Sequence, residues 1–535
     1  MSMRWPISVS QVYINRSGRL AVFVASWRNS TNNFLPSAGY RKERRRDMSQ
    51  WMKEVAIGVI AGMGLAAWLF HEAIVIGLLL TAGGIAFIAL ISSRQQVFHG
   101  IALAVAFWGG IFLYARSAEH WQGLAGEVQF SGLVEIIDRG ETRVFYQPVA
   151  LRPVANDWTG GDILYRAAID FIGQPGERID FSCQLKRPEN FSSDFDYRMF
   201  LASRGIGYAC ERGGHFEASV DRGVSGFRQI LFLIRSDFES RVSALLPEPE
   251  SRLLAGLLVG GGDRLVPEIR DAFARAGLSH IVAVSGYNMS IVAEGLVILA
   301  LGLGLWRRWA VIVAVIGLIF FLLVIDSSAA SFRAALMAWL AFGAYLVGRP
   351  AASWNGLLIA GAIMLVANPL LIRYDVGFQL SFLATLALLV FARHFETFGF
   401  FHHWYGKAAA LFLTTITIEL FTLPVIVGAF GTLSLVAPLA NAFILPLVPI
   451  AMFTGLAAIA FTSFIPTIGF LVLPFAWLPL AVIIRSAEIF SGVPWATLSG
   501  LDSSPVFTVV WYVSLGAVFF GLEKIRKRYA LGMGH

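Results

Sequence analysis

The chain has 535 residues, of which 56% are hydrophobic and only 14% are charged, and its formal net charge is +7. A soluble globular protein carries about 25% charged residues, so this composition excludes a single water-soluble core and the ordinary soluble enzyme classes. A membrane-spanning helix needs about 20 mostly apolar residues. Runs of that length fill residues 54–115 and most of 278–522, which predicts a polytopic α-helical membrane protein of about 10–12 spans.

The N-terminal part divides into an extension and a membrane block. Residues 1–47 are mixed in composition, carry a basic run at Arg41–Arg46 and show no periodicity, so we assign them no function. Met48 or Met52 would be a more natural start. The N-terminal membrane block is expected at 48–115, with spans at 54–70, 73–91 and 97–115.

Residues 116–225 interrupt the apolar sequence and predict an inserted β-rich domain. The stretch 116–250 holds 20 acidic and 15 basic residues, a net charge of −5. Within it, "GEVQFSGLVEII", "TRVFYQPVALRPV", "DILYRAAIDFIG" and "ERIDFSCQL" alternate or are rich in β-branched residues, and Gly-rich or Pro-rich turns separate them. Four or five short strands at this spacing favour a small barrel such as an OB-fold.

Cys183 and Cys210 are the only cysteines, and both lie in this β-rich domain. An exported domain meets an oxidising compartment, where a disulfide between them is expected. Two unpaired, buried cysteines are the alternative.

Residues 226–276 predict a helical connector, and 277–535 predict the main membrane block. "FRQILFLIRSDFESRVSALL" is too charged to span, with apolar residues at helical spacing and Arg228, Arg235 and Arg241 opposite, so the connector is expected along the membrane surface. About nine spans follow, near 278–304, 310–325, 329–347, 353–368, 376–393, 407–428, 434–460, 467–485 and 505–522.

Basic residues predict the orientation of these spans. A basic N-terminal tail favours the cytoplasm, so three crossings would place the β-rich domain outside an inner membrane, and nine more would return the C-terminal "EKIRKRY" to the cytoplasm. Arg485 would then lie outside, against the rule. The late start of the first apolar run argues against a cleaved signal peptide.

Ionisable and polar residues inside apolar runs are costly and therefore mark candidate functional positions. The densest group lies in 256–296, where Ser285–Gly286 also predicts a helix break, which is tolerated at membrane depth only inside protein or beside a cavity. Hydrogen bonding between helices is the alternative explanation for each residue. The candidates in this stretch are Arg270, Arg275, His280, Ser285, Tyr287 and Asn288.

Further candidates follow in three later stretches. Asp326 and Arg333 are seven residues apart, two helical turns, so both can face one groove. Snorkelling to the interface is the alternative for Arg333. Asp375 and Gln379, one turn apart, follow Arg373, and Asn441 lies among prolines that predict a kinked or discontinuous helix.

The chain lacks the Walker and H-E-x-x-H patterns, and its nine histidines are scattered. We therefore expect no catalytic residue, no cofactor and no metal. An intramembrane hydrolase built on Ser285 and His280 is a further alternative, although Ser285 does not lie in a G-x-S-x-G pattern.

Four stretches carry a family resemblance. "RDAFARAGLSHIVAVSGYNMSIV", "SFRAALMAWL", "DVGFQLSFLATLALL" and "PLANAFILPLV" occur in this order, and together they resemble the ComEC-type competence proteins, inner-membrane channels that internalise single-stranded DNA during natural transformation. "FDYRMFLASRGIGY", residues 195–208, resembles the end of that family's extracellular OB-like domain. The resemblance covers about residues 50–522.

The sequence departs from that family in two ways. Its commonest loop reads S-G-L-H, whereas here it is Ser285-Gly286-Tyr287-Asn288, so any role of that histidine would be lost. Longer members carry a C-terminal metallo-β-lactamase-like domain thought to degrade the non-transported strand. This chain shows no such segment, so a separate nuclease is expected.

The resemblance implies a channel for single-stranded DNA, surrounded by lipid and served by a cytoplasmic helicase or strand-binding protein, and it is compatible with a homo-oligomer. Arginines near the mouths would attract phosphates, and polar and aromatic residues would line the path. A transporter or flippase for an anionic substrate is the main alternative, since it uses the same broken helices and buried charges.

Overall fold

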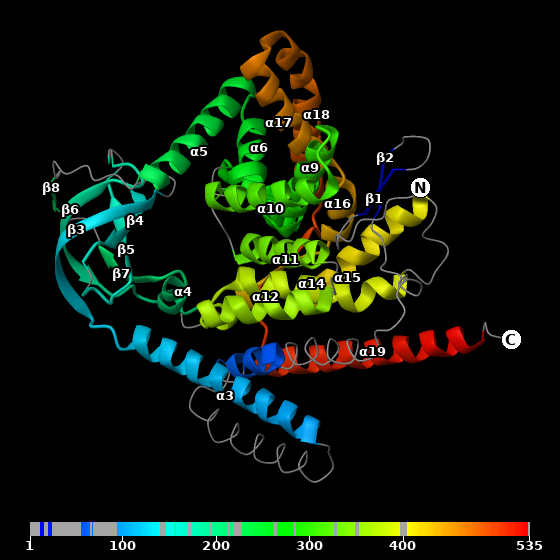
Figure 1. Ribbon diagram of the computed structural model, residues 1–535, viewed down its shortest axis with the longest axis horizontal. Helices are drawn as coiled ribbons and strands as arrows, with labels where there is room; N and C mark the ends of the chain where they lie inside the picture. The colour runs from blue at the N-terminus through cyan, green and yellow to red at the C-terminus, as the bar shows by residue number, and fades with distance from the viewer. Residues whose placement is uncertain are drawn as a thin grey trace. The chain divides into compact units, whose positions relative to one another are not determined.

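A computed structural model describes most of the chain (Figure 1). Its residues form two compact units: a barrel unit of Phe34–Phe238 and Leu358–Val376, and a helical unit of Met1–Asn33, Glu239–Leu357 and Gly377–His535. The described residues are 11–14, 20–23, 55–64, 67, 94–139, 146–155, 157–168, 171, 173–191, 195–210, 215–217, 226–260, 265–282, 285–325, 329–347, 353–395 and 404–532.

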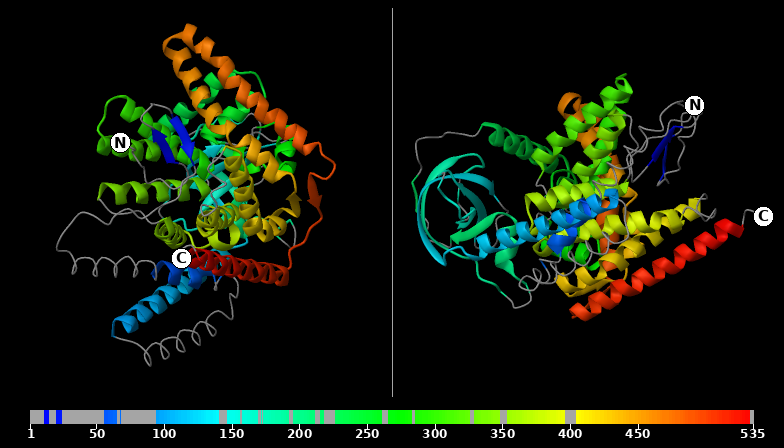
Figure 2. Two further views of the ribbon diagram at one scale, coloured as in Figure 1. Left: turned by 90° about the vertical axis from the view of Figure 1, so that its right-hand side faces the viewer. Right: turned by 60° about the horizontal axis from the view of Figure 1, so that its bottom comes forward.

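The barrel unit contains a sheet that closes on itself. Strand β3 pairs with both β4 and β6, so the order β3-β4-β5-β7-β6 closes into a ring, which the right-hand view of Figure 2 shows. The pairs are antiparallel except for β5 with β7. A closed five-stranded barrel of this kind is OB-like, which confirms the predicted β-rich insert. The strands are β3 (Glu127–Arg139), β4 (Gln147–Pro153), β5 (Asp162–Ala167), β6 (Arg178–Lys186), β7 (Ile206–Cys210) and β8 (His215–Glu217).

Alternating side chains build the barrel core. Val149 and Leu151 on β4 and Ile163 on β5 are fully buried, while their neighbours face outward. Such alternation is what a strand with one buried face requires. Helix α4 (Tyr197–Ser203) lies between β6 and β7 in the chain, and Asp196 caps it by accepting a hydrogen bond from the Met199 backbone N–H.

Cys183 on β6 and Cys210 on β7 form a disulfide between Cα atoms 6.4 Å apart. Both residues belong to the buried cluster of the barrel. The bond closes a loop of 27 residues that contains α4.

Helix α3 (Arg94–Gln122) leads into the barrel and runs past residue 115, where the third span is predicted to end. The Arg187 side chain binds the end of this helix: Nη2 donates to the Trp121 carbonyl at 3.1 Å, and Nη1 donates to the Leu124 carbonyl at 3.0 Å. A basic side chain on these terminal carbonyls stabilises a helix end. The predicted spans 54–70 and 73–91 lie largely outside the described residues; within them, 55–64 is helical.

The 55–64 helix packs closely on α3 through glycine. A Cβ at Gly62 would lie 2.0 Å from the Phe107 carbonyl oxygen, and one at Gly110 would lie 2.5 Å from that of Val59. Only glycine permits this approach, which is a common device for packing helices in membranes.

The helical unit holds the main membrane block (Figure 1). The connector predicted at 226–276 is helical, but α6 is almost wholly buried rather than amphipathic. The helices of the connector and of the block after it are α5 (Gly226–Leu245), which begins in the barrel unit, α6 (Glu250–Val259), α7 (Pro267–Arg275), α8 (Ser279–Val282), α9 (Gly286–Gly302), α10 (Arg307–Val324), α11 (Ala329–Leu346), α12 (Ser353–Ala367), whose residues from Leu358 on belong to the barrel unit, α14 (Val376–Phe395), α15 (Trp404–Phe430), α16 (Ala437–Ile444), α17 (Leu447–Phe464), α18 (Pro466–Ser491) and α19 (Pro505–Gly532).

Within the described residues, five apolar segments are long enough to cross a membrane, and five shorter apolar helices accompany them. Between 22% and 33% of the residues in these five are buried, so most are at least partly exposed, where hydrocarbon would suit apolar side chains. The chain is therefore a multi-pass helical protein. The long segments are Arg307–Val324, Ala329–Leu346, Ala409–Phe430, Ala437–Phe464 and Thr467–Ser491.

Two expected features are refined by the structure. The predicted span 278–304 is two helices, α8 and α9, and 434–460 is broken into α16 and α17 at Leu445–Pro446. Residues 1–47, for which no structure is predicted, contain an antiparallel strand pair, β1 (Gln11–Ile14) and β2 (Leu20–Phe23). A second short pair joins β9 (Thr432–Ser434) to β10 (Thr497–Ser499).

Candidate functional site

The candidate site is the start of α9, where the predicted helix break occurs. Ser285 is extended (φ −100°, ψ 166°) and caps α9 by accepting a hydrogen bond from the Asn288 backbone N–H at 3.4 Å. Its hydroxyl donates to the Asn288 side-chain oxygen at 3.2 Å. Because that proton faces an amide oxygen and not a basic nitrogen, Ser285 is not arranged as an activated nucleophile, which disfavours the hydrolase alternative.

Asn288 is 1% exposed and joins α9 to α6. Its side-chain N–H donates to the Leu257 carbonyl at 3.1 Å, while its oxygen receives the Ser285 hydroxyl. Its amide therefore helps to hold the start of α9 in place.

Arg333 on α11 brings a buried charge to the same place. The side chain is 8% exposed; Nε donates to Ser381 Oγ on α14 at 2.8 Å, and the guanidinium lies 5.9 Å from the Phe382 ring centre. Nη1 faces the sulfur of Met337 at 3.2 Å. Among the described residues no carboxylate forms an ion pair with Arg333.

Gly286 lets this guanidinium reach α9. A Cβ at Gly286 would lie 3.1 Å from Arg333 Nη2 and 3.4 Å from the Ala334 Cβ. The Arg333 charge therefore lies against the N-terminal turn of α9. We call Ser285–Asn288, Arg333 and Ser381 the α9 junction.

The motif "PLANAFILPLV", which begins on α16, also reaches the α9 junction. The Tyr287 hydroxyl lies 3.5 Å from the Leu445 carbonyl at the end of α16. Asn441 on α16 is 5% exposed, and its side-chain oxygen accepts no hydrogen bond from the described residues. At the other end of α16, a Cβ at Gly277 would lie 2.4 Å from the Ala437 Cβ, so the turn after α7 packs directly on this helix.

Several predicted residues do not lie at the α9 junction. Arg270 and Arg275 on α7 and His280 on α8 are exposed. Ser434 Oγ donates to the Arg275 carbonyl at 2.7 Å, which ties α7 to β9. Asp326 lies outside the described residues.

Arg373 and Asp375 belong to the barrel unit, whereas Gln379 is on α14 of the helical unit. Arg373, on the short helix α13 (Leu371–Tyr374), donates to the Ala67 carbonyl. Asp375 is extended (φ −106°, ψ 100°) and follows α13. Asp375 thus directly precedes α14, on which Gln379 lies.

The sequence prediction missed Ser381, Met337 and Phe382, which surround the Arg333 guanidinium. The sequence signal that could have identified Ser381 is its hydroxyl, because a polar side chain stands out in an otherwise apolar helix. No group of three or more potential metal ligands occurs among the described residues.

Four sequence motifs that are far apart in the chain thus meet at one helix break in a multi-pass membrane protein with a β-barrel-like insert. The family described as "Competence protein" matches residues 257–525, half of the chain, and the chain belongs to that family. The match contains every helix of the α9 junction.

The chain is also similar to ComE operon protein 3 of Bacillus subtilis (strain 168). The two are 22% identical over 361 residues, which is 66% of this chain and 44% of the relative. The chain therefore aligns with less than half of that protein's length. No solved structure matches the chain significantly.

Proposed function

We propose that this protein is an inner-membrane channel that conducts single-stranded DNA into the cytoplasm during natural transformation. Membership of the competence protein family supports a role in DNA uptake. The observation that carries the proposal is the Arg333 guanidinium, which is 8% exposed and has no acidic partner among the described residues.

A buried charge without an opposite charge is costly. A phosphate group of a passing strand would supply that opposite charge and would also meet the N-terminal end of α9, which favours anions. Arg333 keeps a hydrogen bond to Ser381 in the absence of DNA, so each phosphate would exchange with an existing partner. Binding of this moderate strength suits conduction, because a permeating strand must also leave each site.

The same proposal includes the orientation and the partners. The barrel domain, residues 116–225, would lie outside the membrane, where its Cys183–Cys210 disulfide is compatible with an oxidising compartment. The termini would be cytoplasmic, near a helicase or strand-binding protein that drives entry. A separate nuclease would degrade the other strand. Arg270, Arg275 and Arg373 are exposed and would attract the strand toward the path.

The test replaces Arg333. We expect Arg333→Ala to lower the entry of labelled DNA about 10- to 100-fold, the value of one charge-assisted hydrogen bond of roughly 1.5–3 kcal/mol. Arg333→Lys should retain part of the activity because it retains the charge. Entry is measured in transformable cells and normalised to the amount of protein in the membrane.

Arg485→Ala is the matched control, because Arg485 is exposed and already paired with Glu488 at 2.7 Å. We expect normal entry in this variant and loss of entry with Asp375→Ala. Normal DNA entry with Arg333→Ala at normal membrane levels would contradict the proposal. Flux of a small anion that is independent of DNA would favour the transporter alternative.

A further inference from the structure

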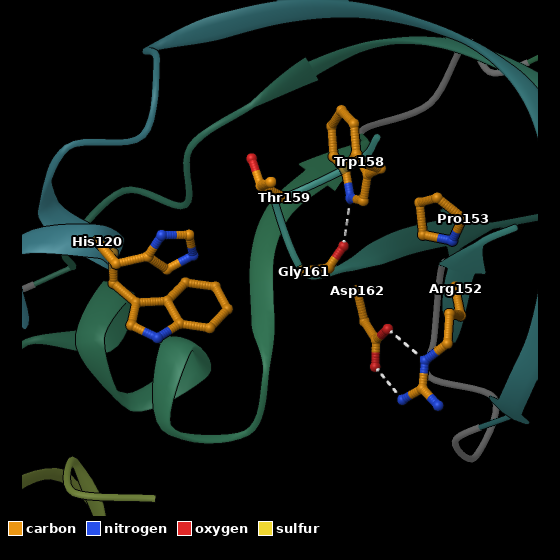
Figure 3. A pocket seen from close by; sticks show the side chains of 8 residues that line it. His120, Arg152, Pro153, Trp158, Thr159, Gly161 and Asp162 are labelled. Carbon is orange, nitrogen blue, oxygen red and sulfur yellow. Dashed lines mark hydrogen bonds and ion pairs between the residues drawn. The ribbon is translucent and has the colours of Figure 1, made fainter. Parts of the chain in front are cut away.

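The barrel domain contains an open cavity of about 370 Å³ on β4 and β5 (Figure 3). Two indoles, an imidazole and a guanidinium line it: Trp121, Trp158, His120 and Arg152. None of these side chains takes part in the α9 junction. In OB-folds the face of the second and third strands binds oligonucleotides or oligosaccharides, and β4 and β5 are those strands here.

Trp158 is held rigidly in the cavity wall. Its Nε1 donates to the Gly161 carbonyl at 2.6 Å, as Figure 3 shows. Its ring packs at 75° on Phe130, with centres 5.2 Å apart, and lies 5.6 Å from the Tyr208 ring. An aromatic surface fixed in this way loses little conformational entropy when a ligand binds.

Trp121 reaches the same cavity because of Gly161. That glycine has a φ of +74°, and a Cβ there would lie 2.6 Å from the Trp121 ring and 2.5 Å from the Gly205 carbonyl oxygen. Gly161 is therefore required for both the turn and the close approach of the ring. Exposed His120 stands next to Trp121, with ring centres 5.2 Å apart.

The charges in the cavity cancel. Arg152 Nε and Nη2 donate to the two carboxylate oxygens of Asp162, each at 2.8 Å (Figure 3). This bidentate pair raises the pKa of Arg152, chiefly through the hydrogen bond to Asp162. The guanidinium keeps its plane fixed and is still half exposed, so it offers a flat face and not an unpaired charge.

We propose that this cavity binds one unstacked nucleobase of the incoming single strand, by stacking on its aromatic side chains and on the Arg152 guanidinium. This inference rests on the proposed function. Every base has a flat π-face, so stacking of this kind accepts any sequence, as a DNA-uptake protein would require. It also explains how a domain in a stretch of net charge −5 can receive DNA without a basic groove.

The experiment uses the full chain in lipid nanodiscs, which leave both faces accessible. A fluorescein-labelled (dT)12 reports binding by anisotropy, and a (dT)12 carrying one 5-iodouracil is photo-crosslinked and mapped by mass spectrometry. We expect crosslinks at Trp121, Trp158 or His120. We also expect the logarithmic salt slopes of wild type and Trp121→Ala to differ by no more than about 0.7, the value for a single phosphate contact on a single strand, because the cavity contacts a base and not the phosphates.

Trp121→Ala should weaken binding about tenfold, since stacking of one base is worth roughly 1–3 kcal/mol, and Trp121→Phe should restore most of it. Arg152→Gln should weaken binding severalfold. Lys186→Gln is its matched control, because it breaks an exposed ion pair with Glu127 on the same barrel at 3.2 Å and outside the cavity. Both Arg152→Gln and Lys186→Gln alter exposed side chains, so neither depends on an intact aromatic core.

Unchanged affinity in both Trp121→Ala and Arg152→Gln, or crosslinks only outside the barrel, would overturn the inference. Binding of an N-acetylglucosamine oligomer that Trp121→Ala abolishes, without crosslinking of (dT)12 in the cavity, would also overturn it and assign the cavity to a glycan. DNA entry is measured separately in cells. Normal entry with unchanged binding in the cavity variants would refute this inference alone, whereas wild-type protein that supports no DNA entry would refute the proposed function.

Discussion

At the residue scale, Arg333 and Gly286 depend on each other. The Arg333 guanidinium packs against Gly286, so that a Cβ at position 286 would lie only 3.1 Å from Arg333 Nη2. Asn288 and Ser285 then fix the turn around Gly286 through hydrogen bonds that involve both the nitrogen and the oxygen of the Asn288 side chain. The position of the charge is thus determined by the absence of a side chain beside it.

Gly286→Ala tests this dependence. The added methyl group requires Arg333 or Ala334 to move by a few tenths of an ångström, so we expect DNA entry to fall severalfold while the protein still inserts. Gly343→Ala is the control, because a Cβ there meets nothing within 4 Å. Equal entry in the two variants would show that the position of the guanidinium does not matter.

At the element scale, local patterns predict the elements and their breaks. Alternation predicts β4 and β5, and the prolines around Asn441 predict the interruption between α16 and α17. The glycine after Ser285 likewise predicts the start of α9. These features could be predicted because each depends on residues that are close together in the chain.

Contacts between elements could not be predicted in the same way. Arg333 and Ser381 are 48 residues apart, and no local periodicity relates them. The cavity was missed for the same reason: β4–β5 pairing brings Leu151 opposite Ile163 and so sets Arg152 beside Asp162, but the register is not visible in either strand alone. The aromatic wall adds Trp121 from the last turn of α3, which continues beyond its predicted end.

The Cys183–Cys210 disulfide is expected to contribute measurably to the stability of the barrel. It joins β6 to β7 around a 27-residue loop, so its loss from Cys183→Ser with Cys210→Ser should destabilise the barrel by about 3–4 kcal/mol through the entropy of the unfolded chain. We expect limited proteolysis of the full chain in nanodiscs to cut within 116–225 at lower protease concentration. The double variant is compared with wild type under reducing conditions, where the difference should disappear. Equal cleavage of the two under oxidising conditions would contradict a stabilising bond.

At the scale of the whole molecule, the charges are distributed unevenly along the chain. The stretch that contains the barrel carries a net −5, whereas residues 1–47 carry a net +7 and residues 251–535 a net +5, which together give the chain its +7. Basic residues beside spans report orientation as much as affinity for DNA. We therefore propose phosphate contacts at the α9 junction and base contacts in the barrel cavity.

We propose above all that a single strand of DNA passes through this protein along the α9 junction. The most direct measurement is single-channel current through the full chain in a planar bilayer, with oligo(dT) added to one side. We predict a conductance that oligo(dT) blocks in discrete events, with Arg333→Ala markedly changing the duration of the blockades and Arg485→Ala leaving it unchanged. A conductance that oligo(dT) does not block, or blockades identical in wild type and Arg333→Ala, would contradict the account.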